Sequence, residues 1–331
     1  MGKIKKYIAK INNYMEAQGI KGKIPFIKVF LDIAVSDMLL GATISDYFLF
    51  RFYEKTMFAR KKFMTARDKR AFYKVMNDTK AKYEVHNKDR FNEIYAEYLK
   101  RDSISIPQSS CEEFCDFIKN HSCVFIKPIE LGGGDGIVKI SSDTTENLPK
   151  LYESFCKKGA HVVEAGIVQH SALAAFHPQS TNSLRVTTFF DGETVKILFA
   201  GVRFGVGDSF VDNHMSGGIL ALIDPDTGKI MSLASSKAKL NILKHPDTGI
   251  FIPGFQIPHW DKCVQLVNEV ARIVPDVHYV GWDLAILEND VCLIEGNTGG
   301  DFTTWQEPTQ TGCKAETDAL VKYMIEKKNQ L

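Results

Sequence analysis

The first third of the chain carries apolar residues at helical spacing. Isoleucines recur at Ile4, Ile8 and Ile11, and a longer series of phenylalanine and aliphatic residues follows among frequent Lys and Arg. Apolar residues three or four positions apart share one face of an α-helix. The pattern predicts a helical N-terminal subdomain over residues 1–105 rather than half of a Rossmann domain.

After residue 105 the pattern changes to short apolar runs bounded by turn residues, which is typical of strands. The runs predict strands at residues 123–127, 137–140, 162–168, 184–190, 195–202 and 218–223. Helical spacing returns at residues 114–119, 148–157, 262–273 and 315–327. Because strands dominate the middle and helices the flanks, the predicted fold class is α+β with mostly antiparallel sheets.

Near the C-terminal end, two apolar runs at 284–287 and 291–294 flank the polar residues 288–290, a pattern that predicts a β-hairpin. With these three residues as the turn, Leu287 pairs with Val291. Further from the turn, Asp283 then lies opposite Glu295.

The same hairpin is the candidate metal site. Side chains alternate between the two faces of a strand, so Asn297 returns to the side of Glu295. Two carboxylates, Asp283 and Glu295, then converge with one amide. Such oxygen ligands suit Mg²⁺ and phosphate chemistry. The alternative is a surface hairpin with scattered polar residues.

A second candidate site joins a lysine to a glycine-rich segment. Lys127 ends a predicted strand, and residues 132–136, Gly-Gly-Gly-Asp-Gly, follow before the next strand. Glycines allow backbone N–H groups to approach phosphate oxygens, and an ammonium group neutralises phosphate charge. The segment is not a Walker loop, because no Gly-Lys-Ser/Thr opens a helix after it. The alternative is an ordinary glycine-rich turn.

Two further strand ends carry polar residues. The strand that begins at His161 is followed by Gln169 and His170, an arrangement that suits either a nucleotide hinge or an interior strand with a hydrogen-bonded histidine. Asn182 and Arg185 lie near the start of the next strand. The guanidinium group of Arg185 could stabilise a transferring phosphoryl group.

Two polar, glycine-bearing segments follow. The loop between residues 200 and 218 has the composition of many functional loops, although such loops often have no function. The segment after the hairpin could shape an acceptor pocket, or it is a surface turn before the last helix. The first contains Arg203, and the second runs over residues 298–305. The candidate substrate-binding residues are Asn182, Asn213, Gly217, Gly218, Thr298 and Gly299.

Charge is divided unevenly along the 331 residues. The whole chain has a net charge of +1, but residues 1–105 contain 22 Lys and Arg against 12 Asp and Glu, a net charge of +10. A basic first third favours an anionic partner such as a sugar nucleotide, an acidic glycan or a membrane surface. Solvated helix faces explain most of these lysines more simply, and no nucleic-acid partner is expected.

Seven cysteines, an odd number without a CxxC pair, predict neither disulfides nor a structural zinc site. This cysteine pattern leads us to expect a reducing cytoplasm, and no secretory signal is visible. Residues 24–40 are apolar, but Lys28, Asp32 and Asp37 interrupt them short of the roughly 20 residues that span a bilayer. The first helix could lie on an anionic membrane, although association with its own domain is favoured.

The order of these elements resembles the ATP-grasp superfamily. A strand lysine, a glycine loop, a Glu-bearing hinge, an Asn-x-x-Arg strand and an Asp…Glu-x-Asn hairpin follow one another. The chain is most similar to the sugar-transfer-associated ATP-grasp group, relatives of glutamate ligases, over about residues 46–305. The segments that carry this similarity are Val163-Glu164 to Gln169-His170, Asn182-Ser183-Leu184-Arg185, Gly217-Gly218 and Glu295-Gly296-Asn297.

The resemblance implies an ATP-grasp fold of two α+β lobes after the helical subdomain, a small lobe at 106–170 and a large lobe at 171–331. ATP lies between them, and Mg²⁺ binds to Asp283, Glu295 and Asn297. The second ATP lysine of the superfamily normally follows an Asp at a helix start. Here residues 87–90 read Asn-Lys-Asp-Arg, so Lys88 and Arg90 compete for that role.

The implied nucleotide contacts extend from the phosphates to adenine. Lys127 contacts phosphate, residues 132–136 cover the β and γ phosphates, and residues 164–168 hold adenine, while His170 stands where a ribose-binding carboxylate is common. The implied cofactor-binding residues are Lys88, Lys127, Gly132, Gly133, Gly134, Asp135, Gly136, Glu164, Ile167, Val168 and His170.

The activity implied is that of an ATP-dependent carboxylate–amine ligase. A carboxylate attacks the γ-phosphoryl group, and an amine displaces the resulting acyl phosphate, with Lys127, Arg185 and Arg203 as the catalytic candidates. The expected substrates are an amino acid or amine and a sugar carboxylate of a bacterial surface polysaccharide. Two alternatives stay open, a small-molecule or sugar kinase and a non-catalytic nucleotide-binding scaffold for a glycosyltransferase. The sequence leaves the oligomeric state open.

Overall fold

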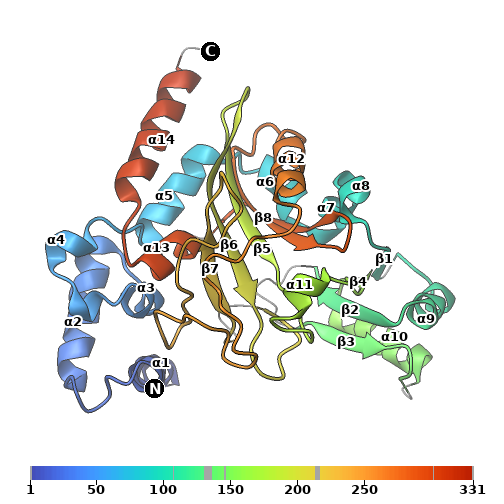
Figure 1. Cartoon of the computed structure of the whole chain (residues 1–331), viewed down its shortest axis with the longest axis horizontal. Helices are drawn as coiled ribbons and strands as arrows, with labels where there is room; N and C mark the ends of the chain where they lie inside the picture. The colour runs from blue at the N-terminus through green and yellow to red at the C-terminus, as the bar shows by residue number, and fades with distance from the viewer. Residues whose placement is uncertain are drawn as a thin grey trace.

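The computed structural model describes residues 2–106, 108–129, 136–144, 147–212, 217–300 and 302–329. Figure 1 shows helices of the first third on two sides of a large twisted sheet, with a smaller sheet beside one end of it. Both sheets are antiparallel throughout their described strands. The predicted α+β class with antiparallel sheets is confirmed.

The first hundred residues are helical, as their apolar spacing predicts. Side-chain caps begin several of these helices; Thr43 and Asp46, for example, form a capping box at α3. The helices are α1 (Gly2–Ala17), α2 (Phe26–Leu40), α3 (Ile44–Leu49), η1 (Phe52–Glu54), α4 (Met57–Arg60), α5 (Ala66–Met76), α6 (Ala81–His86), α7 (Lys88–Ile94) and α8 (Ala96–Leu99).

These helices divide among three apolar cores. Helices α1 to α3 enclose an aromatic core that contains Tyr14 and Phe48, whose rings stack at 4.8 Å. Helix α5 contributes Phe72 to a second core beneath the larger sheet. Helices α6 to α8 contribute residues such as Phe91 to the main core on the opposite face. The helical prediction is confirmed, whereas the domain boundaries stay a prediction.

The smaller sheet has the strand order β1-β4-β2-β3. Its strands are β1 (Ser103–Ile106), β2 (Cys123–Pro128), β3 (Val138–Ser141) and β4 (His161–Ala165). Helices α9 (Cys111–Asn120) and α10 (Leu148–Lys158) pack against it through Phe114 and Phe155. Strand β1 has no counterpart among the predicted strands. Strand β4 ends at Ala165 rather than at residue 168, because the chain there leaves the sheet toward the larger one.

The larger sheet has the order β7-β6-β5-β8-β9. Its strands are β5 (Leu184–Phe190), β6 (Val195–Phe204), β7 (Ile219–Ile223), β8 (Tyr279–Ile286) and β9 (Val291–Asn297). Helix α12 (Trp260–Val270) covers one face, α13 (Thr303–Thr309) and α14 (Lys314–Lys328) lie on the other side, and the short α11 (Ser171–Ala174) precedes β5.

Alternation along these strands separates an apolar face from a polar one. Leu184 and Val186 of β5 enter the main core, whereas Arg185 points to the opposite face. At Gly201 of β6, an added Cβ would lie 2.8 Å from Cγ2 of Thr304. The glycine therefore lets α13 lie close against the polar face.

The β8–β9 hairpin confirms one predicted pairing and corrects another. Asp283 lies opposite Glu295, as predicted, but Val291 pairs with Ile286 and not with Leu287. A β-bulge after Asp283 inserts one extra residue into β9 and accounts for the shift.

The turn of this hairpin is also shorter than predicted. The N–H of Leu287 donates to the carbonyl oxygen of Asp290 at 2.8 Å. Glu288 and Asn289 therefore form a two-residue turn rather than part of a three-residue one.

Within the described ranges, no helix has the length and apolar content needed to cross a membrane. The longest apolar candidate in the sequence, residues 24–40, forms the 15-residue helix α2.

Asn77, just after α5, joins the first third of the chain to the larger sheet. Its Nδ2 donates to the carbonyl oxygens of Tyr279 and Thr298, each at 2.8 Å, and its Oδ1 accepts from the N–H of Tyr279 at 2.9 Å. The residue is buried. The Asn77 side chain thus bonds to the backbone of the larger sheet just beyond the last β8–β9 pair, Gly281 and Asn297.

Asn77→Ala is expected to lower the free energy of unfolding by about 3 kcal/mol, because it removes three hydrogen bonds to buried backbone groups. Urea unfolding measures the effect. Asn268→Ala is the control, since the Asn268 amide donates to the carbonyl oxygen of Val264 within the same helix, α12. Equal losses in the two variants would contradict the proposed role of Asn77.

Candidate active site

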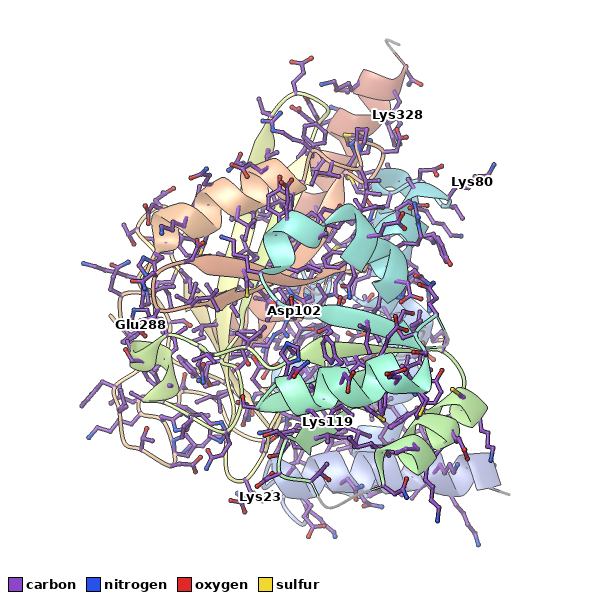
Figure 2. All side chains as sticks on the ribbon, turned by 90° about the vertical axis from the view of Figure 1, so that its right-hand side faces the viewer. Lys23, Lys80, Asp102, Lys119, Glu288 and Lys328 are labelled. Carbon is purple, nitrogen blue, oxygen red and sulfur yellow. The ribbon has the colours of Figure 1, made fainter. Side chains whose placement is uncertain are left out.

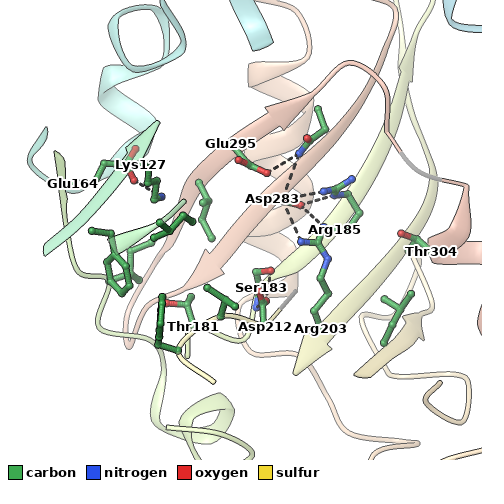
Figure 3. A pocket seen from close by; sticks show the side chains of 18 of the residues that line it. Lys127, Glu164, Thr181, Ser183, Arg185, Arg203, Asp212, Asp283, Glu295 and Thr304 are labelled. Atoms are coloured by element: carbon green, nitrogen blue, oxygen red, sulfur yellow. Dashed lines mark hydrogen bonds and ion pairs between the residues drawn. The ribbon is translucent and has the colours of Figure 1, made fainter. Parts of the chain in front are cut away.

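A cavity of about 310 Å³ lies between the two sheets. Its walls come from β2 and β4 of the smaller sheet, from β5, β6, β8 and β9 of the larger sheet, and from α13. Figure 3 shows the charged side chains that point into it. The volume is within the usual range for small-molecule sites, about 300–1,000 Å³.

A row of charged residues crosses the polar face of the larger sheet. Arg185 on β5 lies opposite Asp283 on β8, and Asp283 lies opposite Glu295 on β9. Arg203 reaches the same place from β6, where its backbone N–H donates to the carbonyl oxygen of Ser183. Neighbouring strands thus bring together residues that are up to 110 positions apart in the sequence.

Asp283 is the centre of this row. Arg185 donates to its Oδ2 at 3.0 Å through Nη2, and Arg203 donates to its Oδ1 at 2.8 Å through Nη2. Burial by itself raises the pKa of Asp283, but the two guanidinium groups outweigh it and hold the pKa well below its usual range. Asp283 is therefore ionised at neutral pH.

The three predicted metal ligands lie together. Nδ2 of Asn297 donates to Oε1 of Glu295 at 3.0 Å and to Oδ2 of Asp283 at 3.4 Å. Burial and then the charge of Asp283 raise the pKa of Glu295. Two carboxylates that repel each other beside an amide are a donor set that fits Mg²⁺. The described residues contain no group of three or more His, Cys, Asp or Glu side chains that could hold a metal ion.

On the opposite wall, Lys127 and Arg101 share the carboxylate of Glu164. Lys127 Nζ lies 2.6 Å and Arg101 Nη2 lies 3.1 Å from Oε2 of Glu164. Burial raises the pKa of Glu164, but Arg101 and Lys127 outweigh it and lower the pKa to about 2. Arg101 also donates to the carbonyl oxygens of Leu293 and Ile294 on β9, so it links the two sheets.

The structure distinguishes Lys88 from Arg90. Lys88, in the first turn of α7, donates to the carbonyl oxygens of Pro128 and Ile129 at 2.9 and 3.3 Å and lines a small recess next to the main cavity. Arg90 pairs with the outer residues Glu84 and Glu93. Of the two competing residues, Lys88 lies at the candidate site.

Comparison with known protein families decides the identity. Residues 52–322 match the family described as sugar-transfer associated ATP-grasp. The chain belongs to this family. The resemblance in its motifs is thereby confirmed, and no curated protein matches the chain.

Solved ATP-grasp ligases are similar to this ATP-grasp chain at low identity. The ligase PsnB with its minimal precursor is 12% identical over 75% of this chain and 63% of its own, with a TM-score of 0.46. A PsnB structure that also contains Mg and ADP has 14% identity, 75% and 62% coverage and a TM-score of 0.45. D-alanyl-alanine synthetase A from Vibrio cholerae has 13% identity, 76% and 67% coverage and a TM-score of 0.48. The chain thus spans less than two thirds of the length of these two PsnB chains.

Several predicted cofactor residues of the ATP-grasp chain lie away from the cavity or outside the described structure. Ile167 lines the cavity, but the side chain of Val168 is 84% exposed. His170 caps α11, where its Nδ1 accepts from the N–H of Ala172. Gly136 is in the left-handed region, with a φ of 75°. The residues outside the described ranges are Gly132, Gly133, Gly134, Asp135 and Asn213.

The predicted substrate residue Asn182 has a structural position instead. Its buried Nδ2 donates to Oε1 of Gln169 and to the carbonyl oxygens of Leu173 and His177, and its Oδ1 accepts from the N–H of Gly205. These bonds hold the segment before β5 in place. Asn182 is not among the residues that line the cavity, and its contact with substrate stays a prediction.

The four other predicted substrate residues that the structure describes are also absent from the cavity wall. Gly218 packs against backbone, since an added Cβ would lie 2.3 Å from the carbonyl oxygen of Asp212, and Gly217 adopts a φ of 106°. The carbonyl oxygen of Thr298 accepts from Asn77, and Gly299 lies near Tyr73.

Two residues of the cavity wall, Ser183 and Asp212, are absent from the predicted site. The N–H and Oγ of Ser183 donate to Oδ2 of Asp212 at 2.7 and 2.5 Å. Burial raises the pKa of Asp212, and the positive charge of Arg203 lowers it by less, so the pKa stays above its usual value. Alternation from Arg185 could have identified Ser183, two positions earlier, whereas no sequence signal connects it with Asp212.

Glu164→Gln is expected to lower the free energy of unfolding at pH 7 by about 3 kcal/mol, because it leaves the buried Arg101 guanidinium without its counter-charge. Urea unfolding of this variant and of Glu153→Gln, an exposed glutamate on α10, measures the effect.

The same comparison should depend on pH. The folded-state pKa of Glu164, about 2, lies below the unfolded value of about 4.3, so the wild-type advantage is complete above the unfolded value. It is expected to decline as pH falls toward 2. An advantage that stays constant from pH 7 to pH 2.5 would contradict the ion-pair account.

Proposed function

We propose that this protein is an ATP-dependent ligase that joins a carboxylate to an amine and releases ADP and phosphate. The observation that carries the proposal is the charged row of Arg185, Asp283 and Glu295 on one wall of the cavity, with Lys127 on the opposite wall. Paired carboxylates suit Mg²⁺, and the cations suit the charge that spreads over a transferring phosphoryl group. Membership of the ATP-grasp family supports ATP as the phosphoryl donor.

In this proposal the nucleotide occupies the part of the cavity beside the smaller sheet. Lys127 and Lys88 offset phosphate charge there, and Ala165 and Ile167 supply an apolar contact for the base. Asp283, Glu295 and Asn297 would hold Mg²⁺, which supplies charge neutralisation to the phosphates when bound. Glu164 holds the ammonium group of Lys127 in position.

The carboxylate and the amine take the part of the cavity beside β5 and β6. Arg203 and Arg185 present planar guanidinium groups, which match the oxygens of a carboxylate or an acyl phosphate. The partly buried carboxylate of Asp212, fixed by Ser183, suits the incoming amine. In the reaction, a carboxylate oxygen attacks the γ-phosphorus, ADP leaves, and the amine nitrogen then displaces phosphate from the acyl carbon.

The substrate class follows from the family description alone. Association with sugar transfer supports a sugar carboxylate and an amino acid or amine as the two substrates, in the synthesis of a surface polysaccharide. All seven cysteines are free thiols, which supports a cytoplasmic location.

The test is product analysis with hydroxylamine, which intercepts activated acyl groups. The protein is incubated with Mg-ATP, hydroxylamine and a panel of uronic-acid sugar nucleotides and amino acids. An ATP-dependent hydroxamate formed together with ADP is the expected result. A stable phosphorylated acceptor would instead identify a kinase, and saturable ATP binding without any product on the panel would favour the scaffold.

Glu295→Gln is expected to weaken binding of Mg-ATP at least tenfold, because an amide replaces a carboxylate ligand of similar size. Binding of ATP with EDTA should change little. Calorimetric titration with and without Mg²⁺ measures both.

Glu288→Gln, in the turn of the same hairpin, is the matched control and should bind Mg-ATP normally. If Glu295→Gln bound Mg-ATP as tightly as this control, the metal assignment would be wrong.

A further inference from the structure

The outer face of α2 exposes a continuous row of aliphatic side chains. The exposed fractions are 61% for Ile27, 56% for Leu31, 38% for Val35, 70% for Met38 and 49% for Leu39. Their spacing of three to four residues places them on one side of the helix. We call this row the α2 face.

The opposite side of α2 already supplies the core. Val29, Ile33 and Leu40 are buried in the aromatic cluster formed with α1 and α3. Helix α2 is therefore held in the described structure by its opposite side, and the α2 face takes no part in this packing. Exposed apolar surface of several hundred Å² commonly marks an interaction site.

Helix α1 adjoins the α2 face. The ring of Tyr7 contacts the ring of Phe30 with centroids 6.1 Å apart, and Ile4 and Ile8, on the same side of α1 as Tyr7, are 69% and 37% exposed. The apolar surface thus extends from α2 toward the N-terminal half of α1.

Cations surround this surface. Lys5, Lys6 and Lys10 on α1 are exposed, and so are Lys23 in the turn before α2 and Lys28 on α2 itself. Figure 2 shows Lys23 at the edge of the molecule that α1 forms.

Few acidic groups oppose these cations. Residues 1–40 contain seven Lys and three acidic residues, a net charge of +4. Of the acidic residues, Glu16 pairs with Lys21 and Asp32 pairs with Arg60. The surface therefore combines aliphatic side chains with an uncompensated positive charge.

This surface is separate from the candidate active site. Helix α2 lies at the edge of the molecule opposite the smaller sheet (Figure 1), and no residue of the α2 face lines the cavity between the sheets. Residues 1–51 also precede the part of the chain that matches the ATP-grasp family.

We propose that the α2 face, together with the lysines of α1, binds the surface of an anionic lipid bilayer. Aliphatic side chains enter the boundary between headgroups and acyl chains, while neighbouring lysines contact anionic headgroups. The helix lies on the bilayer and does not cross it.

The composition of the α2 face favours a bilayer over a protein partner. It contains no Trp, Tyr or Arg, the residues that dominate the binding energy of protein–protein interfaces. The residues around it are lysines, which are depleted in such interfaces.

The test is sedimentation of the full chain with two kinds of vesicle, phosphatidylcholine alone and phosphatidylcholine with one third phosphatidylglycerol. We expect binding to the anionic vesicles at 0.1 M salt, and at least tenfold weaker binding to the neutral vesicles or at 0.5 M salt. Absence of binding, or equal binding to both kinds of vesicle, would overturn the proposal.

Variants locate the surface that binds. Leu31→Ser combined with Met38→Ser should reduce binding at least tenfold, and Lys5→Gln combined with Lys6→Gln should also reduce it. Met231→Ser is the control, because Met231 is 56% exposed on another part of the molecule. All of these positions are exposed, so circular dichroism should show an unchanged fold.

Two outcomes of the variant experiment would overturn the proposal. One is normal vesicle binding by the Leu31→Ser, Met38→Ser protein. The other is a concentration-dependent dimer that this double variant abolishes, since a second copy of the chain would then be the occupant of the α2 face. Neither outcome depends on ligase activity, so the proposed function is tested independently.

Discussion

A buried carboxylate that accepts from two guanidinium groups organises the polar face of the larger sheet. Asp283 is 3% exposed, and removing either arginine would leave its charge poorly compensated in a place with little water. Arg185 and Arg203 come from β5 and β6, so the ion pairs also fix how these strands present their side chains beside β8. The candidate metal ligands Glu295 and Asn297 lie next to the same carboxylate.

A second ion-pair group holds the opposite wall of the cavity. Glu164 on β4 binds Lys127 and Arg101, and Arg101 also binds two carbonyl oxygens of β9. The two walls are thus joined through one side chain from the end of the helical first third. The helices there do more than cover the sheets, because α7 also brings Lys88 to the recess next to the cavity.

The sequence was sufficient for those parts of the site that lie close together along the chain. Alternation within one hairpin predicted that Asp283, Glu295 and Asn297 share a face, and their contacts agree. The turn was predicted one residue too long. The extra residue lies instead in a β-bulge of β9, which restores the pairing of Asp283 with Glu295. A bulge has no signal in the order of polar and apolar residues.

The remaining parts depend on contacts between distant residues. Arg101 and Glu164 are 63 positions apart, and neither segment indicates that the other faces it. Asn182 is a residue type that often binds ligands, yet its amide bonds to Gln169 and to backbone groups that only the fold brings near. The sequence identified residues 24–40 as apolar. Which side of α2 is exposed could not be predicted, because it depends on which side α3 covers.

The central claim is that Mg²⁺ and ATP bind between the two sheets at the β8–β9 hairpin. A crystal structure with Mg²⁺ and a non-hydrolysable ATP analogue tests it most directly. The account predicts a metal ion coordinated by Asp283, Glu295 and Asn297, with the analogue's phosphates near Lys127. A nucleotide bound elsewhere, or a metal ion without these ligands, would contradict it.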